Sequence, residues 1–210
     1  MANIKAALDS DEHMTILVLG DATGMDDDTS RETRWVTRWA VELATERPVS
    51  VATRLSDGGY ETVNRFGSGQ AAPLEILNAS NNPSRLADVV AQPETLLFDD
   101  IDLVILNFGH SEPEADLAAN LDKFWAALPP RTMGLVMTQN PQRGDGAQDQ
   151  RARMDIVRDW AKKNEAPFID VFGAFVAAPE PLAQLLGPDR INPTDRGSEV
   201  WRDAVVAAFK

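Results

Sequence analysis

The sequence predicts an α/β fold in which helices cover both faces of a mainly parallel β-sheet. Five short apolar runs have the length and sharp boundaries of strands buried on both faces. Segments with helical spacing lie between them, and strands that alternate with helices form parallel sheets. We therefore expect a flavodoxin-like, doubly wound three-layer sandwich with a sheet of about five strands. The runs are residues 15–19, 74–78, 102–107, 133–138 and 168–171.

The intervening segments carry the start and stop signals of helices. Apolar residues form a stripe at helical spacing from Trp35 to Ala44, and Thr29 or Ser30 is placed to cap that helix. Ser84 is placed to cap the next one. The turn signal at 56–59, between residues 49–55 and 60–66, indicates a β-hairpin or an extended excursion. Further helices are expected at residues 114–128, 148–164, 179–186 and 195–209.

The chain has the size of one domain. Its 210 residues and 23.0 kDa are enough to bury a large core. Residues 1–12 are expected to form a short N-terminal arm or irregular lead-in, and residues 13–210 a single domain. The tryptophans at positions 125, 160 and 201 fall at apolar helix positions and are expected to pack internally.

Composition excludes several classes of partner. The formal net charge is −13 and the pI is about 4.5, so the surface repels nucleic-acid phosphate. No apolar run is long enough to cross a bilayer, and the first residues lack the apolar core of a signal peptide, so we expect synthesis in the cytoplasm without membrane insertion. Without cysteine, neither disulfides nor thiolate metal sites are available, and we expect no cofactor.

Polar loops follow the predicted strands at the edge where doubly wound folds bind ligands. The first is Gly20-Asp21-Ala22-Thr23-Gly24. The loop after the third strand contains Gly109-His110-Ser111-Glu112, and the segment 189–197 begins Asp189-Arg190-Ile191-Asn192-Pro193.

These loops, taken in order, resemble the SGNH hydrolase (GDSL esterase/lipase) family over nearly the whole chain. The family's first block is Gly-Asp-Ser, and the chain matches it except that Ala22 replaces the serine nucleophile. The third block is Gly-X-Asn-Asp/Glu, where Ser111 replaces the asparagine that donates to the oxyanion. The last block is Asp-X-X-His-Pro, which retains Asp189 and has Asn192 in place of the histidine. The second block has no glycine in the region 78–83.

The resemblance implies the fold of an esterase without its chemistry. Alanine has no nucleophilic atom, and an amide is not a base near neutral pH. Without the histidine, Asp189 has nothing to orient. An engineered serine-to-alanine change would explain Ala22 alone, whereas three departures together indicate natural loss. We therefore expect no catalytic residues.

Two other chemistries remain open. A Thr23–His110 pair is an alternative nucleophile and base, although Thr23 is more simply a turn residue and His110 a loop residue. A cation site would need Asp26, Asp27 and Asp28 with Asp21, Glu112 or Asp189. Acidic residues before a helix are favourable without a ligand, and we expect no metal.

The leading hypothesis is a catalytically inactive SGNH-fold protein that acts as a structural or glycan-binding module. The composition and the Gly-Asp-X-Thr-Gly block are similar to SGNH-like proteins of actinobacterial phages, which implies a virion protein of the tail or capsid with other virion proteins as partners. The alternative is an active esterase or carbohydrate deacetylase with non-standard residues. The side chains expected to bind in the cleft are Asp21, Thr23, Asn81, Asn82, His110, Ser111 and Asn192.

Overall fold

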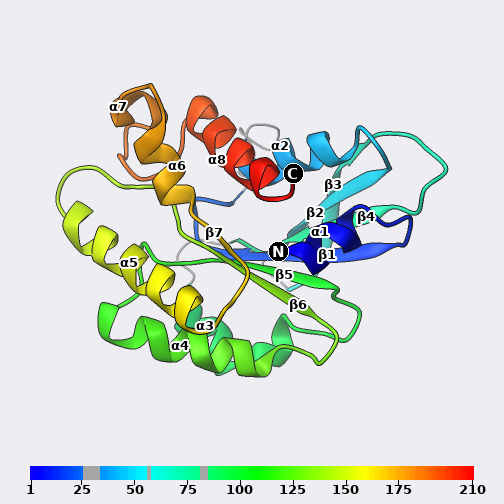
Figure 1. The fold of residues 1–210 in the computed structure, drawn as a ribbon, viewed down its shortest axis with the longest axis horizontal. Coiled ribbons are helices and arrows are strands. Elements are labelled where there is room, and N and C mark those ends of the chain that lie inside the picture. Colours follow the sequence, from blue (N-terminus) through cyan, green and yellow to red (C-terminus); the bar gives the residue numbers. More distant parts are fainter. Residues whose placement is uncertain (26–33, 56–57, 81–84) are drawn as a thin grey trace.

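The protein is a three-layer α/β/α sandwich around one sheet (Figure 1). The computed structural model describes residues 1–25, 34–55, 58–80 and 85–210. Within these residues seven strands pair in the order β3-β2-β4-β1-β5-β6-β7. The strands are β1 (Met14–Gly20), β2 (Val49–Arg54), β3 (Tyr60–Phe66), β4 (Leu74–Asn78), β5 (Leu103–Asn107), β6 (Met133–Met137) and β7 (Phe168–Ile169). The predicted fold class is confirmed.

The sheet gains two strands beyond the five predicted buried runs because the expected hairpin joins it. β2 pairs in parallel with β4, and β3 runs antiparallel to β2 at the sheet edge. The register of this antiparallel pair shifts between Val51 and Ala52. Every other pairing is parallel. The hairpin therefore extends the parallel sheet by an antiparallel edge.

Helices cover both faces because alternate residues of the central strands point to opposite sides. Ile16 and Val18 of β1 pack into one apolar cluster, and Leu17 and Leu19 into the other. α3 (Leu86–Ala91), α4 (Glu114–Ala127) and α5 (Ala147–Lys163) cover the second face (Figure 1). The first face carries α1 (Ala2–Leu8), α2 (Trp35–Leu43), α6 (Val171–Ala177), α7 (Leu182–Leu185) and α8 (Asp195–Ala208). A short 3-10 turn, η1 (Pro93–Thr95), follows α3.

The N-terminal segment, expected to be a short arm or an irregular lead-in, begins with a helix. Residues 2–8 form α1, and Ile4 is only 1% exposed. Ile4 and Leu8 lie four positions apart, so both face the same side of the helix and join the core cluster that contains Trp39. Ala7 packs against the same cluster, so the apolar side of this short helix docks on the core.

The predicted strand at 168–171 is also shorter than expected. β7 ends at Ile169, and the side chain of Asp170 accepts a hydrogen bond from the Gly173 N–H as the N-cap of α6. The carboxylate satisfies one of the amides that a helix start leaves unpaired. α6, which was not predicted, begins at this cap.

The predicted tryptophan core is confirmed where α2 packs against α8. Trp35 and Trp201 are fully buried and stack with their ring centroids 5.4 Å apart. On the other face, the rings of Trp125 and Trp160 pack edge to face, with their centroids 5.2 Å apart. The proposed caps Thr29, Ser30 and Ser84 lie outside the described residues.

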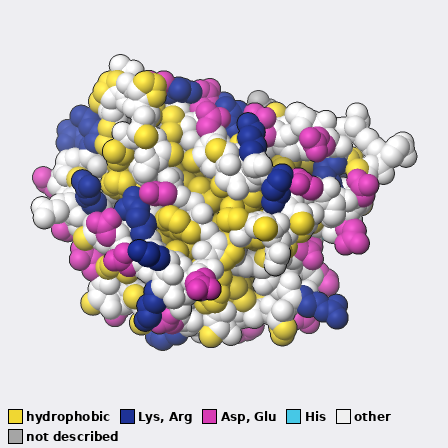
Figure 2. Space-filling model, in the orientation of Figure 1, with side chains coloured by type: hydrophobic (Ala, Val, Ile, Leu, Met, Phe, Trp, Pro, Cys, Tyr) yellow, Lys and Arg dark blue, Asp and Glu magenta, His cyan; other side chains and the backbone are white. Residues whose placement is uncertain are grey.

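The surface carries acidic and basic side chains intermixed rather than in separate patches on the face shown in Figure 2. In the part of the chain that the structure describes, no helix is both long enough and apolar enough to span a membrane.

Candidate functional site

The turn after β1 presents Ala22 at the carboxyl edge of the sheet. The Oδ1 atom of Asp21 accepts hydrogen bonds from the backbone N–H of Thr23 at 3.1 Å and from its hydroxyl at 2.8 Å. This local closure is an Asx turn, and it leaves Asp21 and Thr23 buried while Ala22 is half-buried. The motif residue at the nucleophile position is therefore held at the apex of a rigid turn.

The two glycines of this turn are required by close packing. A Cβ at Gly20 would lie 2.9 Å from the carbonyl oxygen of Asn107, at the end of β5. A Cβ at Gly24 would lie 2.7 Å from the hydroxyl oxygen of Ser80. The carbonyl of Gly24 also accepts a hydrogen bond from the Asn78 side chain at 2.9 Å. The turn is thus packed directly against the ends of β4 and β5.

The candidate positions that come from distant parts of the sequence meet in one cleft of about 210 Å³. Ala22, Ser111 and Asn192 all line it, so the loops after β1 and β5 converge with the loop before α8. The full lining consists of Asp21, Ala22, Thr23, His110, Ser111, Gln142, Ile191 and Asn192. Asn81 and Asn82, which the sequence also suggested, lie outside the described residues.

The last loop corrects the expectation that Asp189 would have nothing to orient. Its Oδ2 atom accepts a hydrogen bond of 2.6 Å from the side-chain amide of Asn192. Its Oδ1 atom accepts the backbone N–H groups of Ile191 and Asn192, each at 3.0 Å. The carboxylate therefore orients the side chain of Asn192, which stands where the family motif has its histidine.

These contacts also act on the acidity of Asp189. Burial by itself raises the pKa of this carboxyl, and the hydrogen bonds from Ile191 and Asn192 outweigh it. The positive charge of Arg34 acts in the same direction as the hydrogen bonds. The pKa of Asp189 is consequently lower than its ordinary value, and the residue is a carboxylate at neutral pH.

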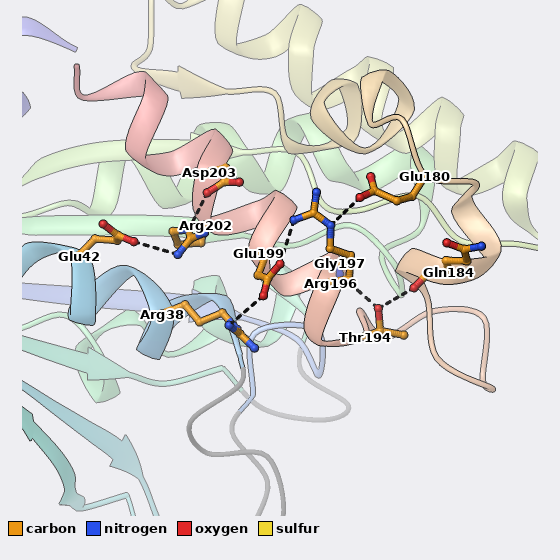
Figure 3. Close-up of polar contacts among 10 residues, drawn as sticks. All are labelled: Arg38, Glu42, Glu180, Gln184, Thr194, Arg196, Gly197, Glu199, Arg202 and Asp203. Atoms are coloured by element: carbon orange, nitrogen blue, oxygen red, sulfur yellow. Dashed lines mark hydrogen bonds and ion pairs between the residues drawn. The ribbon is translucent and has the colours of Figure 1, made fainter.

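The helix that follows this loop is anchored by polar contacts on both sides (Figure 3). Thr194 caps α8 by accepting from the Gly197 N–H and donates its hydroxyl to the Gln184 carbonyl. Three arginines then form ion pairs, some within α8 and some between α8 and neighbouring segments. The ion pairs are Arg196–Glu180, Arg196–Glu199, Arg38–Glu199, Arg202–Glu42 and Arg202–Asp203. Exposed pairs of this kind contribute little individually, but together they connect α8 with α2 and with the segment before α7.

The loop that carries His110 and Ser111 is fixed from two sides. Arg153 of α5 donates to the carbonyls of Gly109 and His110. Glu112 is 2% exposed, and its carboxylate accepts the first backbone amides of α3, from Leu86 at 2.9 Å and Ala87 at 3.2 Å. The side chain of Asn120 donates to the same carboxylate at 2.9 Å. Glu112 therefore joins this loop to the start of α3 and to α4.

The alternative Thr23–His110 pair shares the cleft, but each side chain is bonded elsewhere. The Thr23 hydroxyl donates to Asp21 and accepts from the Gln139 amide at 3.3 Å. The Nδ1 atom of His110 pairs with Oε1 of Gln142 at 3.2 Å. No hydrogen bond connects Thr23 with His110 among the described residues.

The described acidic residues that were considered for a cation site do not form a metal cluster. Glu112 holds α3 and Asp189 holds Asn192, while Asp26, Asp27 and Asp28 lie outside the described residues. Across the ranges that the structure covers, no three His, Asp or Glu side chains form a metal cluster.

Comparison with known proteins agrees with the resemblance of these loops to the motifs of one family. A model of the GDSL-like lipase/acylhydrolase family matches residues 18–200. The chain belongs to this family. Comparison with curated proteins gives no match.

Solved structures of the family's fold are similar over nearly their full length. A lipolytic protein of the G-D-S-L family from Veillonella parvula is 12% identical with a TM-score of 0.65, covering 92% of this chain and 97% of its own. An α/β hydrolase from the metagenome of Lake Arreo is 19% identical with a TM-score of 0.67. The match covers 93% of this chain and 94% of the hydrolase. An acetyl xylan esterase from Geobacillus stearothermophilus is 16% identical with a TM-score of 0.64. The match covers 95% of this chain and 97% of the esterase. At these identities the likeness shows the fold alone.

The GDSL frame of the chain holds residues that do not support serine-esterase chemistry. Ala22 offers no hydroxyl, and Asn192 cannot take up and return a proton. Loss of one oxyanion donor costs about 3–4 kcal/mol of transition-state stabilisation, and Ser111 has a shorter side chain than the asparagine of the family motif. What remains is a shaped cleft with polar walls.

Sequence reasoning missed two residues of this cleft wall, Gln142 and Ile191. The loop after β6 was expected at this edge, but no motif distinguishes Gln142 within it. Ile191 is 38% exposed, and it lies inside the last motif at a position where the family pattern allows any residue.

Proposed function

We propose that this GDSL-family chain is catalytically inactive and that it serves as a structural or glycan-binding module. The observation that carries the proposal is the meeting of Ala22, Ser111 and Asn192 in one cleft. The positions of nucleophile, oxyanion donor and base converge there. Ala22 has no nucleophilic atom, Asn192 is not a base, and Ser111 has a shorter side chain than the asparagine of the motif.

Retention of the surrounding architecture supports a binding role for the cleft. Asp189 still orients the residue at the histidine position, and Glu112 and Arg153 still hold the loop with Ser111. Polar groups on a concave surface fix the orientation of a bound ligand. Hydroxyl-rich sugars match such a lining, which is the basis for proposing a glycan. The acidic composition and the first motif support a place in a phage virion as the setting.

The experiment that tests inactivity is a hydrolysis assay with a small activated ester such as p-nitrophenyl acetate. We expect the purified protein to give no turnover above the buffer rate. The opposing candidate is an esterase that uses Thr23 and His110, and it is favoured by their shared position on the cleft wall. Turnover that disappears in both Thr23→Ala and His110→Ala would establish that candidate and refute inactivity.

The glycan role is tested separately by titration with soluble oligosaccharides under calorimetry. Binding that is weakened by Asn192→Ala and unchanged by Ala22→Gly supports the cleft as the site. Absence of binding to neutral, acetylated and amino oligosaccharides alike would leave the structural role as the remaining part of the proposal.

A further inference from the structure

Three hydrogen-bond acceptors on the cleft wall have no partner among the described residues. They are Oδ2 of Asp21, Nε2 of His110 and Oδ1 of Asn192, and all three residues line the cleft. Asp21 is only 5% exposed, so its second carboxylate oxygen is withdrawn from bulk water. Buried polar atoms in native proteins are nearly always paired, and an unpaired group at a cleft points to a bound partner.

The hydrogen bonds that His110 and Asn192 make through their other polar atoms indicate that Nε2 and Oδ1 are acceptors. Gln142 donates its Nε2 to the Asp145 carbonyl at 3.2 Å, which leaves Oε1 facing His110. Nδ1 then donates its proton to this oxygen, and in the neutral imidazole Nε2 presents a lone pair. Asn192 donates its Nδ2 to Asp189, so Oδ1 is the free end of the amide.

The side-chain donors of the cleft are, by contrast, largely engaged. The Thr23 hydroxyl donates to Asp21, and the amide nitrogens of Gln142 and Asn192 donate to Asp145 and Asp189. An esterase cleft needs donors, because its substrate presents a carbonyl oxygen that becomes an oxyanion. The buried side-chain atoms that have no partner on this cleft wall are acceptors instead.

We propose that the cleft binds a primary ammonium group, supplied by an unacylated amino sugar. This inference rests on the proposed glycan-binding function and specifies its ligand. An ammonium group has three N–H donors and no acceptor, so the acceptor atoms of Asp21, His110 and Asn192 are suitable partners for it. The Asp21 carboxylate supplies the opposite charge in a protein whose net charge is −13. The cleft volume of about 210 Å³ limits the ligand portion inside it to a small group.

N-acetylation of the same sugar opposes this binding. It removes the positive charge and two of the three N–H donors, and it adds a carbonyl acceptor that faces other acceptors. The cleft therefore selects the deacylated sugar, whereas an esterase cleft accommodates the acylated one.

The test is isothermal calorimetry at neutral pH with a matched pair of ligands, glucosamine oligomers and N-acetylglucosamine oligomers of equal length. We expect the glucosamine oligomer to bind at least about tenfold more tightly. Ethanolamine and MnCl₂ form two further arms, which separate the ammonium group from the sugar and from a divalent cation.

Two variants assign the binding to the acceptor atoms. Asp21→Asn keeps the oxygen that closes the Asx turn and replaces the other with an N–H₂ donor, so it should abolish the preference for the amine. His110→Phe removes Nε2 and keeps a flat ring, and it provides a second readout if Asp21→Asn fails to fold. His13→Phe, at the exposed second histidine, is the matched control and should bind like the unaltered protein.

The outcomes separate this inference from the function on which it rests. Equal or tighter binding of the N-acetylated oligomer overturns the ammonium site and leaves glycan binding intact. Binding of ethanolamine without either sugar supports the ammonium site and refutes the glycan. Binding of Mn²⁺ alone, or of no ligand, overturns the inference, as does a preference for amine that survives in both cleft variants.

Discussion

Asp189 accepts a 2.6 Å hydrogen bond from the side chain of Asn192, three residues further along the loop before α8. In the GDSL motif the same two positions hold the aspartate and histidine of the triad. The hydrogen bond between the two positions is therefore present with asparagine, because an amide N–H can replace an imidazole N–H as the donor, although an amide cannot serve as a base.

This relationship predicts that catalysis can be restored. The triple variant Ala22→Ser, Ser111→Asn, Asn192→His should hydrolyse p-nitrophenyl acetate, because Asp189 is already placed to orient the new imidazole. Adding Asp189→Asn to the triple variant should lower kcat by at least about 100-fold, since loss of the triad aspartate leaves the wrong tautomer of the histidine. Equal activity with and without Asp189→Asn would contradict an orienting role for this residue.

Glu112 is predicted to be a large contributor to stability. Glu112→Ala leaves the Leu86 and Ala87 amides and the Asn120 side chain without their common acceptor. We expect the free energy of unfolding, measured with urea, to fall by about 2–4 kcal/mol. Glu114→Ala, at an exposed glutamate two residues away, should change it by less than about 0.5 kcal/mol. Similar losses in the two variants would show that the buried carboxylate has no special role.

Asp170 is predicted to make the stability of the protein depend on pH in the acid range. Burial raises the pKa of this carboxyl, but hydrogen bonds from Arg158, Gly173 and Thr138 and the charge of Arg158 together hold it below its ordinary value. A group whose folded pKa is lowered stabilises the fold above its unfolded pKa, about 3.9, and this contribution is lost as the pH falls through the folded value.

Asp170→Asn should therefore be less stable than the unaltered protein at neutral pH, and the difference should shrink as the pH falls from about 5 to about 3. Urea unfolding at a series of pH values measures it. Asp159→Asn, at an exposed position of α5, is the control and should show no such convergence. A constant difference over the whole range would mean that the Asp170 charge is not stabilising.

The strands were predictable because a parallel strand that is buried on both faces has a nearly continuous apolar sequence, as in 15–19 and 103–107. The helix α1 was not, because Ile4 and Leu8 alone give too weak a period, and only docking against the core selects the helix. The end of β7 depends on whether Asp170 continues a strand or caps a helix, and tertiary contacts with Thr138 and Arg158 decide it.

For the candidate site, sequence order predicted which loops would lie together, since motif spacing and the carboxyl edge of a parallel sheet constrain them. The hydrogen bonds could not be predicted. Whether Asp189 reaches Asn192, and whether His110 turns toward Gln142, depends on loop conformation that no local pattern encodes. The roles of these residues in binding stay predictions.

Tyr60, the one tyrosine in the sequence, provides a direct spectroscopic test of local burial at the start of β3. Burial raises the pKa of its hydroxyl to about 12, and the nearby positive charge of Arg54 offsets only part of this shift. Because the folded pKa is raised, the stabilisation linked to the neutral phenol is present below an unfolded pKa of about 10 and is lost as the pH rises through about 12. Tyrosinate absorbance should accordingly titrate near pH 12 in the native protein and near 10 in urea, while circular dichroism checks that the fold persists. Arg54→Gln should move the native midpoint still higher, whereas a native midpoint near 10 would show that the hydroxyl is open to water.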